Sequence, residues 1–417
     1  MFGFKNNKNI SIGGIDVSDL AKQYGTPLIA YDQKHLEQRV DLFLNSFKSD
    51  RFNTEILFAS KSASIIGLYK VLDQKGLSFD VVSSGEIFIA LKAGINSKKI
   101  YFHGNNKTRD EIYFAVENNI GTIMVDNFYE LKLLSSITKK LNKSIDIIQR
   151  VNPYISAGAN EKIKTAEDDS KFGISIYNSF DELKEVLDKN NLLNFRGFHS
   201  HIGSQILKKT PFFNLVDELK SFTDKMTIKF SFDTLNFGGG FGVKYTDEDF
   251  KLKDFLEEYI IKIEKTFYDI KSIKRIMIEP GRSMVAESSV TIYTIGGFKQ
   301  TSSGKQHLYV DGGMTDNIRP TLYDAHYTYD INNNSNGMKN YIISGKCCES
   351  GDTLAKSYSL PKASIGQHLV SYTTGAYTFS MASNYNQIGK PEVILIKDKK
   401  VKVIHKRQSF EDLISNM

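Results

Sequence analysis

The sequence predicts an α/β protein: a barrel of eight parallel strands and helices, followed by a mainly β domain. Eight short apolar runs end in polar or glycine turns, amphipathic helical patterns separate them, and β-rich runs replace the helical patterns after about Glu287. Eight alternating repeats favour a closed barrel over an open sheet. The eight strand ends are Lys61, Phe79–Ser83, Ile100–Gly104, Thr122–Asp126, Ile145–Arg150, Phe198–His201, Leu235–Gly238 and Ile276–Glu279.

The elements before the barrel follow ordinary helix and strand signals. Apolar residues at helical spacing predict a helix over Asp16–Tyr24, which the Gly25–Pro27 turn stops. Leu28–Tyr31 reads as a strand, and an amphipathic helix follows it. We expect the barrel to span residues 33–287, and residues 1–32 and 288–417 to form the β-rich domain.

The second domain is predicted from short β-rich runs bounded by Gly, Asn and Ser. Helical patterns are nearly absent from it until the tail at Phe410–Ile414. The runs are Ser289–Ile295, His307–Asp311, Asn340–Ser344, Gln367–Tyr372 and Glu392–Ile396.

Composition restricts the class of protein. The 417 residues are 41% hydrophobic, enough for two domains with large cores, and the net charge of +6 is modest and spread out. This distribution does not suggest a nucleic-acid partner. No apolar run approaches the roughly 18 residues of a membrane span, and no signal peptide is apparent at the N-terminus. The two cysteines, Cys347 and Cys348, are adjacent and cannot join distant segments. We therefore expect a cytoplasmic protein that binds neither membrane nor nucleic acid.

The residues suited to chemistry lie where the predicted strands end. In a parallel barrel these ends meet at one mouth, so residues far apart in sequence share a pocket. These residues are Lys61, Asp80, Arg150, His201, Gly238–Gly240, Glu279 and Arg282.

Lys61 closes the apolar run Ile56–Ala59. A lysine at a strand end often extends into solvent, which is the simple structural interpretation. The functional interpretation is an amine held in a pocket, with a lowered pKa, that attacks a carbonyl carbon.

Gly238, Gly239 and Gly240 follow an apolar strand, and Phe241-Gly242 continues the cluster. Turns without side chains let backbone N–H groups approach an anion, although a tight structural turn explains such a cluster equally well. The stretch lacks the lysine of a P-loop, and Val243 stands where a dinucleotide fingerprint needs its last glycine. A single phosphate fits better than a nucleotide.

His199 and His201 share one face of a strand end, and Ser204 follows shortly after. Two such histidines can ligate metal, but no third and fourth ligands stand out nearby, so no metal is expected. From chemistry alone, His201 stacking on a flat ring, with Ser204 donating to a phosphate, fits equally well. The default for His199 is a structural role.

Glu279 lies at the end of the eighth predicted strand, and Arg282 follows three residues later. A carboxylate this deep needs a cation or a proton, and an internal Glu279–Arg282 pair would supply the former. Alternatively, Glu279 faces a heteroaromatic N–H and Arg282 faces an anion. Farther on, Glu349 and Asp352 beside Cys348 favour the neutral thiol, which is able to donate a proton.

These groups together suit one ligand. Lys61 suits an aldehyde, the glycines suit a phosphate, and Glu279 suits a ring nitrogen. Pyridoxal 5′-phosphate carries all three groups.

With these motifs in order, the chain resembles the diaminopimelate decarboxylase family of pyridoxal-phosphate decarboxylases, which share a fold with alanine racemase. The resemblance covers the chain almost end to end. The matching segments are Phe58–Lys61, Phe79–Glu86, Phe102–Lys107, Asp169–Gly173, His199–Gln205, Gly238–Gly242, Glu279–Arg282, Asp311–Met314, Ile318–Tyr323, Cys348–Asp352 and Gly375–Asn386. Departures are small: Ser62-Ala-Ser64 replaces the commoner Ala-Asn, Ser84 stands where Gly is usual, and Asn236 replaces an acidic or other polar residue.

The resemblance implies a role for each matched position. Lys61 would be the Schiff-base lysine, and His201 would lie against the cofactor ring. Ser204, Gly238, Gly239, Gly240 and Tyr377 would lie at the phosphate, and Glu279 would pair with the pyridine nitrogen. Substrate-binding positions of the family match Arg282, Arg319, Tyr323, Glu349 and Tyr377. Arg282 also matches a cofactor-binding position, and Cys348 matches the proposed proton donor.

The resemblance also implies a homodimer in which Cys348 and Glu349 reach into the partner's barrel. It implies decarboxylation of meso-2,6-diaminopimelate to L-lysine and CO₂, the last step of lysine biosynthesis. Arg282 and Arg319 suit a substrate with a second, distal carboxylate. Two alternatives stay open: a related decarboxylase acting on carboxynorspermidine, D-ornithine, lysine or a carrier-tethered amino acid, and a non-catalytic relative. The second would typically have lost Lys61 or Cys348.

Overall fold

The computed structural model describes residues 5–6, 9–155, 170–246, 250–332 and 337–417. The chain divides into two compact units, each made of segments that are separate in the sequence. The barrel unit consists of Val40–Gly242 and Phe250–Gly281. The β unit consists of Met1–Arg39, Val243–Asp249 and Arg282–Met417. None of the helices in the described ranges combines the length and apolarity needed to cross a bilayer.

Eight parallel strands form a closed ring in the barrel unit. Each strand pairs in parallel with the next one along the chain, and the last pairs with the first, which closes the ring. The short strand β10 (Ile174–Ser175) adds to the side of one of them. The eight strands are β5 (Asn53–Ala59), β6 (Ser78–Val81), β7 (Ile100–Phe102), β8 (Thr122–Val125), β9 (Ile145–Asn152), β11 (Leu193–His199), β12 (Thr234–Asn236) and β13 (Arg275–Ile278).

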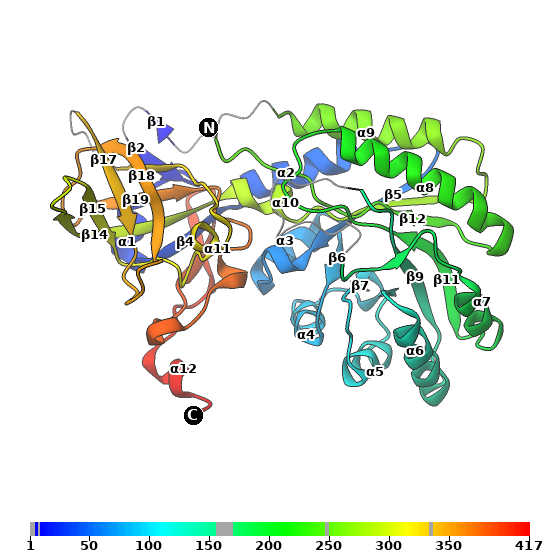
Figure 1. The fold of residues 1–417 in the computed structure, drawn as a ribbon. Helices are drawn as coiled ribbons and strands as arrows, with labels where there is room; N and C mark the ends of the chain where they lie inside the picture. Colours follow the sequence, from blue (N-terminus) through cyan, green and yellow to red (C-terminus); the bar gives the residue numbers. More distant parts are fainter. Residues whose placement is uncertain (1–4, 7–8, 156–169, 247–249, 333–336) are drawn as a thin grey trace. The chain divides into compact units, whose positions relative to one another are not determined.

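Helices lie outside the ring, between successive strands (Figure 1). Several begin with a polar side chain that caps their first amides: Ser83, Thr108 and Asn127 each accept a hydrogen bond from the backbone of the following turn. This arrangement brings all strand ends to one face of the barrel. The helices are α2 (Gln33–Ser46), α3 (Ile66–Gln74), α4 (Ser84–Lys92), α5 (Arg109–Glu117), α6 (Phe128–Leu141), α7 (Asp181–Asp188), α8 (Thr210–Lys229) and α9 (Leu252–Thr266).

The interior of the barrel is filled by side chains rather than open. A buried apolar cluster inside it consists of Leu57, Tyr101, Met124, Ile148 and Met277, from five different strands. The hydroxyl group of Tyr101 donates to Glu55 at 2.8 Å, and Arg275 pairs with Glu55 at 3.3 Å. Glu55 and Arg275 lie near the starts of their strands, so these polar groups close the end of the barrel opposite the strand ends.

The β unit is built on the long strand β14 (Ser289–Gln300). Its first half pairs with β4 (Leu28–Asp32) and β19 (His368–Tyr372), and its second half pairs with β15 (Gln306–Val310). The sheet order is β18-β17-β15-β14-β4-β20-β21, and β16 pairs with β19. The remaining strands are β16 (Tyr329–Ile331), β17 (Met338–Ser344), β18 (Thr353–Pro361), β20 (Glu392–Lys397) and β21 (Lys400–His405).

The two ends of the chain share one core in the β unit. Leu20 of α1 (Val17–Tyr24) and Ala30 of β4 lie in the same buried cluster as Ile292 and Ile394. A three-stranded sheet of β1 (Lys5–Asn6), β2 (Asn9–Ile12) and β3 (Ile15–Asp16) precedes α1. The short helices α10 (Arg282–Val285), α11 (Arg319–Tyr323) and α12 (Phe410–Ile414) complete the unit.

The predicted fold class is confirmed: an eight-stranded parallel barrel and a mainly β unit. The structure also contains elements that the sequence analysis did not predict, namely β16, β18, β21, α11 and the small N-terminal sheet. β18 and β21 are edge strands with several exposed residues, and β16 has only three residues, so their apolar patterns are weak. The predicted domain limits at residues 33 and 287 stay a prediction.

Candidate active site

The barrel unit brings several of the predicted residues together where its strands end. Lys61 lies in the 3₁₀ turn Ser60–Ser62 directly after β5 and is exposed, although Ser60 and Ser62 are buried. Asp80 lies on the neighbouring strand β6 and is 2% exposed. Burial raises the pKa of the Asp80 carboxyl group, and the charge of Lys61 is among the influences that oppose this rise.

Glu279 follows β13 and is 5% exposed. The Asn236 Nδ2 group donates to its Oε1 at 2.6 Å, and the Nε2 of His199 lies 3.1 Å from its Oε2. The Nε2 of His103 lies 3.1 Å from Oε1. Burial by itself would raise the pKa of Glu279, but the two imidazoles outweigh it and hold that pKa well below its usual value. The carboxylate is therefore ionised in the interior of the protein.

The two histidines contact Glu279 differently. Burial lowers the pKa of His199 to about 4, so its ring is neutral and donates to Glu279 from Nε2. The Nε2 of His103 also lies 3.6 Å from Oδ1 of Asp80. Nε2 of His103 and Oδ1 of Asp80 have no hydrogen-bond partner of good geometry among the described residues, so this nitrogen contacts both carboxylates by proximity.

These side chains are also of the kinds that ligate metals. Ligand atoms of His103, His199 and Glu279 lie within 4.8 Å of one another. The pair of possible metal ligands suggested by the sequence was His199 and His201 instead. The oxygens of Glu279 already accept from Asn236 and His199. These side chains thus also form a carboxylate–imidazole network, and the expectation of no metal stays a prediction.

The glycine turn after β12 packs tightly against the turn after β11. A Cβ atom at Gly238 would come 2.4 Å from the carbonyl oxygen of Ser200, and one at Gly240 would come 2.7 Å from that of Gly203. Gly238 and Gly240 also have φ values of +65° and +107°, which favour glycine. Ser204 is half-buried directly after Gly203.

The turn already uses two of its amides internally. The N–H of Gly238 donates to Oδ1 of Asn236 at 2.9 Å, and that of Gly239 donates to Nδ1 of His201 at 3.0 Å. No acceptor for the Gly240 amide is found in the described parts of the chain. Of the three predicted phosphate-binding amides, Gly240 is thus the one available to an anion.

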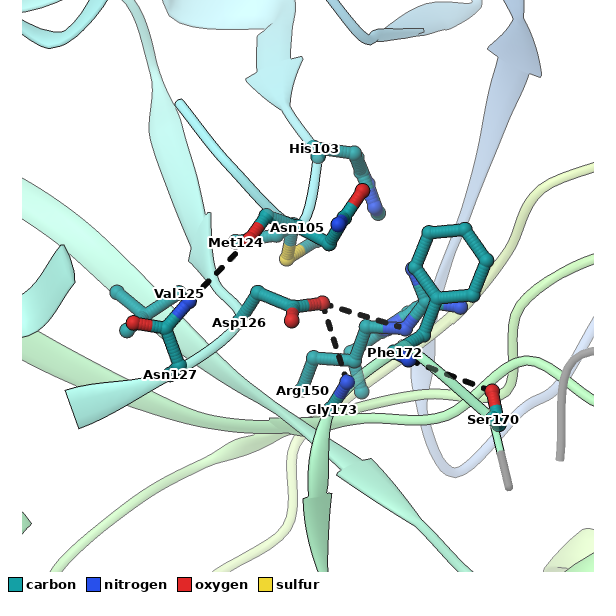
Figure 2. Close-up of polar contacts among 12 residues, drawn as sticks. His103, Asn105, Met124, Val125, Asp126, Asn127, Arg150, Ser170, Phe172 and Gly173 are labelled. Atoms are coloured by element: carbon teal, nitrogen blue, oxygen red, sulfur yellow. Dashed lines mark hydrogen bonds and ion pairs between the residues drawn. The ribbon is translucent and has the colours of Figure 1, made fainter. Parts of the chain in front are cut away.

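A second polar cluster lies beside this network, at the ends of β8 and β9. Figure 2 shows Asp126 between the side chain of Arg150 and the backbone of Gly173: Oδ1 lies 4.0 Å from Nε of Arg150 and accepts from the Gly173 amide at 3.2 Å. The guanidinium of Arg150 lies 4.3 Å above the ring of Phe172. Asp126 therefore joins the Ser170–Gly173 segment to the end of the barrel.

The β unit contains the predicted arginines. The Nη1 of Arg282 donates to the hydroxyl oxygen of Tyr245 at 2.9 Å, and its guanidinium lies 4.8 Å from the ring centre of Tyr377. The guanidinium of Arg319 lies 5.5 Å from the same ring and 5.1 Å from that of Tyr323. Tyr377 has a φ of +58°, an uncommon conformation for a side-chain-bearing residue that often marks a functional position.

Arg319 is 7% exposed and its Nε has no hydrogen-bond partner in the described residues. No carboxylate of those residues lies within ion-pair distance of its guanidinium. A buried cation without an acid partner is costly, so this position fits an anionic ligand group.

Cys348 and Glu349 lie on an exposed loop of the β unit. The carboxylate of Asp352 holds this loop: its Oδ1 accepts from the amide of Met314 at 2.7 Å and its Oδ2 from the amide of Cys347 at 2.8 Å. The amide of Cys348 donates to Oδ1 of Asn386 at 2.8 Å. The thiol of Cys348 is thus presented outward on a constrained backbone.

The residues of the barrel unit fit a ring that carries an aldehyde, a phosphate and a basic ring nitrogen. Lys61 offers an exposed amine, Gly240 offers an amide, and Glu279 offers an ionised acceptor. Sequence reasoning did not assign His103 and treated His199 as structural. The sequence signal that could have identified both histidines is their position at strand ends, since His103 follows β7 and His199 ends β11.

Comparisons with known proteins agree with this chemistry. Residues 33–286 match the family model described as the pyridoxal binding domain of pyridoxal-dependent decarboxylases. The chain is 39% identical to a diaminopimelate decarboxylase of Bacillus subtilis, over 97% of this chain and 94% of the relative. It is 38% identical to one of Staphylococcus aureus, over 99% and 98%. A crystal structure of diaminopimelate decarboxylase from M. jannaschii in co-complex with L-lysine superposes with a TM-score of 0.93 at 29% identity, covering 99% of this chain and 96% of that one.

Proposed function

Because the chain belongs to the pyridoxal-dependent decarboxylases, in the diaminopimelate decarboxylase family, we propose that it converts meso-2,6-diaminopimelate to L-lysine and CO₂ with pyridoxal 5′-phosphate. This reaction is the last step of lysine biosynthesis. The observation that carries the proposal is the ionised, buried carboxylate of Glu279 at the end of the barrel strands that also end at Lys61 and the glycine turn.

Residues of the barrel unit would hold the cofactor at its aldehyde, its phosphate and its ring. The Lys61 amine would bind the aldehyde carbon, and the Gly240 amide and the Ser204 hydroxyl group would bind the phosphate. Gly238 and Gly239 shape the turn that presents this amide, since a Cβ atom at either would clash with neighbouring backbone. His201, held by the Gly239 amide, would lie against the ring, and the family resemblance assigns Tyr377 to the phosphate.

When bound, the cofactor supplies an electron sink for the pair of electrons left as CO₂ departs. Glu279 makes this sink effective because an ionised carboxylate stabilises a proton on the ring nitrogen that it faces. Its negative charge is available because Asn236, His103 and His199 compensate its burial.

The arginines of the β unit would bind the substrate. Arg319 lacks an acid partner in the described residues and suits the distal carboxylate of diaminopimelate, and Arg282 contacts the ring of the same tyrosine, Tyr377. Tyr323 stacks on Arg319, and Glu349 would accept from a substrate amine. This site favours a substrate that ends in a carboxylate over ornithine or arginine, which end in cations.

The thiol of Cys348 would deliver the proton that replaces CO₂ on the α-carbon. Its exposure, and that of Glu349, fit a homodimer in which these residues enter the partner's active site. The proposed enzyme therefore needs both subunits. The cytoplasmic location expected from the sequence stays a prediction.

The alternative is a related decarboxylase that keeps the cofactor residues but binds another amino acid or polyamine precursor. A non-catalytic relative is disfavoured because Lys61 and Cys348 are both present.

CO₂ release from a panel of substrates tests the proposal. The panel contains meso-diaminopimelate, D- and L-ornithine, D- and L-lysine, arginine and carboxynorspermidine, each with added pyridoxal phosphate. We expect release from meso-diaminopimelate at a kcat/KM at least about 100-fold above the others, the range of discrimination when a buried polar group is left unpaired. Lys61→Ala should also lose the visible absorbance of the bound cofactor, whereas Lys70→Ala on the exposed face of α3 should keep it. Equal release from another substrate would contradict the specificity, and an unchanged Lys61→Ala spectrum would contradict the cofactor site.

A further inference from the structure

His103 stands between two buried carboxylates. Its Nε2 lies 3.1 Å from Oε1 of Glu279 and 3.6 Å from Oδ1 of Asp80, and all three side chains are at most 6% exposed. Two carboxylates this close in a low-dielectric interior repel each other when both are ionised. The group between them therefore affects which of the two carries the charge.

The two carboxylates respond in opposite directions. Burial raises the pKa of Asp80, whereas the imidazoles hold the pKa of Glu279 well below its usual value despite its burial. The cluster thus keeps its negative charge on Glu279, whereas it makes ionisation of Asp80 less favourable. Electrostatic attraction from His103 is the first of the influences that lower the pKa of Glu279.

His199 and His103 act on Glu279 in different ways. His199 makes a hydrogen bond to Oε2 with good geometry, and its neutral ring orients the carboxylate without adding charge. Oε1 already accepts from Asn236 at 2.6 Å, so His103 is not needed to fill that oxygen. His103 acts on this carboxylate through the position of its Nε2, which lies 3.1 Å from Oε1, and its influence lowers the pKa of Glu279.

We propose that His103 is a positioning residue that keeps Glu279 ionised, by standing between it and Asp80, and thereby keeps a proton on the ring nitrogen that Glu279 faces. This inference rests on the proposed function, because it assumes that Glu279 pairs with the cofactor nitrogen. It adds a division of labour: His199 and Asn236 orient the carboxylate, and His103 sets its charge.

Other charged groups face this cluster from the neighbouring elements and act on the same balance. Arg150 stabilises negative charge on both Asp80 and Glu279, and the electrostatic influence of His103 extends to Asp126. Among the described residues these groups include Lys61 after β5, Asp80 on β6, Glu86 on α4, Lys107 before α5, Asp126 after β8, Arg150 on β9, His199 and His201 at the end of β11, and Glu279 after β13.

The test compares two substitutions that each leave a neutral amide donor. Holoenzymes of the wild type, His103→Gln and His199→Gln are prepared with pyridoxal phosphate labelled with ¹⁵N at the ring nitrogen. The ¹⁵N chemical shift reports directly whether this nitrogen is protonated, and it is followed from pH 6 to pH 9 without substrate. Dissociation constants for the cofactor are measured by fluorescence, and circular dichroism checks folding.

We expect the proton affinity of the ring nitrogen to fall at least about tenfold in His103→Gln, one unit on the pH axis, because the substitution removes the imidazole whose influence is the first of those that lower the pKa of Glu279. In His199→Gln the ring nitrogen should lose its proton at nearly the same pH as in the wild type, because the glutamine amide can replace the hydrogen bond that is the only function assigned to His199. Cofactor affinity should fall about tenfold in His103→Gln. The inference would be overturned if this pH were unchanged in His103→Gln, or if it shifted equally in both variants.

Asp80→Asn provides a second measurement that does not depend on the folding of the His103 variant. Removing the competing carboxylate leaves Glu279 as the nearest acid to His103. The ring nitrogen should then lose its proton at the same pH as in the wild type or at a higher one. A loss of the proton at lower pH would overturn the inference. A wild-type protein that binds no pyridoxal phosphate would instead defeat the proposed function, so the two failures are distinguishable.

Discussion

The backbone N–H of Gly239 donates a 3.0 Å hydrogen bond to Nδ1 of His201, so a glycine in the turn after β12 orients an imidazole in the turn after β11. Because Nδ1 accepts, the proton of the neutral ring lies on Nε2. Burial, together with the charges of Lys61 and Arg150, lowers the pKa of His201 well below its usual value, so the ring is uncharged. The glycine turn and the imidazole thus behave as one structural part.

Gly239→Ala should weaken cofactor binding about 10- to 100-fold, the cost expected for a displacement of about 1 Å at a site. The new Cβ atom would come 2.1 Å from the carbonyl oxygen of Glu279, and this backbone atom moves only if the turn moves. Fluorescence titration with pyridoxal phosphate measures the effect. Gly296→Ala is the matched control, because no atom lies within 4 Å of its new methyl group. Equal affinities in both variants would contradict the role assigned to the turn.

Arg319→Met should raise KM for meso-diaminopimelate about 10- to 100-fold, since a hydrogen bond to a charged group contributes about 1.5–3 kcal/mol. Methionine retains the apolar stem that packs near Tyr323 and Tyr377 but removes the guanidinium. Steady-state kinetics and the cofactor spectrum are compared with those of Lys356→Met, which removes an exposed cation of the same unit. An altered spectrum in Arg319→Met would instead place Arg319 at the cofactor.

Asp316 should make the stability of the protein depend on pH. Burial raises its pKa to about 7, above the usual value near 4 in an unfolded chain, so the folded state binds the proton more tightly. Its stabilising contribution is therefore complete below about pH 4 and is lost as the pH rises through 7. The loss is on the order of 1–4 kcal/mol.

Asp316→Asn should flatten this dependence, because the amide carries no charge at any pH. Its oxygen can still accept from the Gly313 amide, which donates to Asp316 at 2.9 Å, and its NH₂ group can donate to the hydroxyl group of Tyr293. Urea unfolding at pH 5.5, 7 and 8.5 measures the difference, with Asp188→Asn on the exposed face of α7 as control. A variant as sensitive to pH as the wild type would show that other groups cause the dependence.

Asp126 should hold the Ser170–Gly173 segment against the barrel. Asp126→Ala removes both the acceptor of the Gly173 amide and the partner of Arg150, and should destabilise the protein by about 1–3 kcal/mol. Asp126→Asn keeps the acceptor and removes only the charge. Hydrogen exchange at the Gly173 amide should accelerate in the alanine variant and stay near the wild-type rate in the asparagine variant. Equal acceleration in both would assign the effect to Arg150 instead.

The fold class could be predicted because each barrel strand is a short apolar run with a helical pattern after it, and both signals are local. The strand β4 was also predicted, over Leu28–Tyr31. Its place in the β unit, between β14 and β20, depends on pairings with residues more than 250 positions away. The edge strand β18 escaped prediction because its exposed Lys and Ser residues weaken the apolar pattern.

The amino-acid sequence by itself determined which chemical groups end the strands: the amine of Lys61, the glycines at 238–240 and the acid of Glu279. Only the tertiary structure decided how these groups are used. It brings His103 between Asp80 and Glu279 and turns the Gly239 amide toward His201 rather than toward an anion. The reason is physical: residue type and periodicity are properties of neighbouring positions, whereas the charge of a buried acid depends on every group that the closed barrel places within a few ångströms of it.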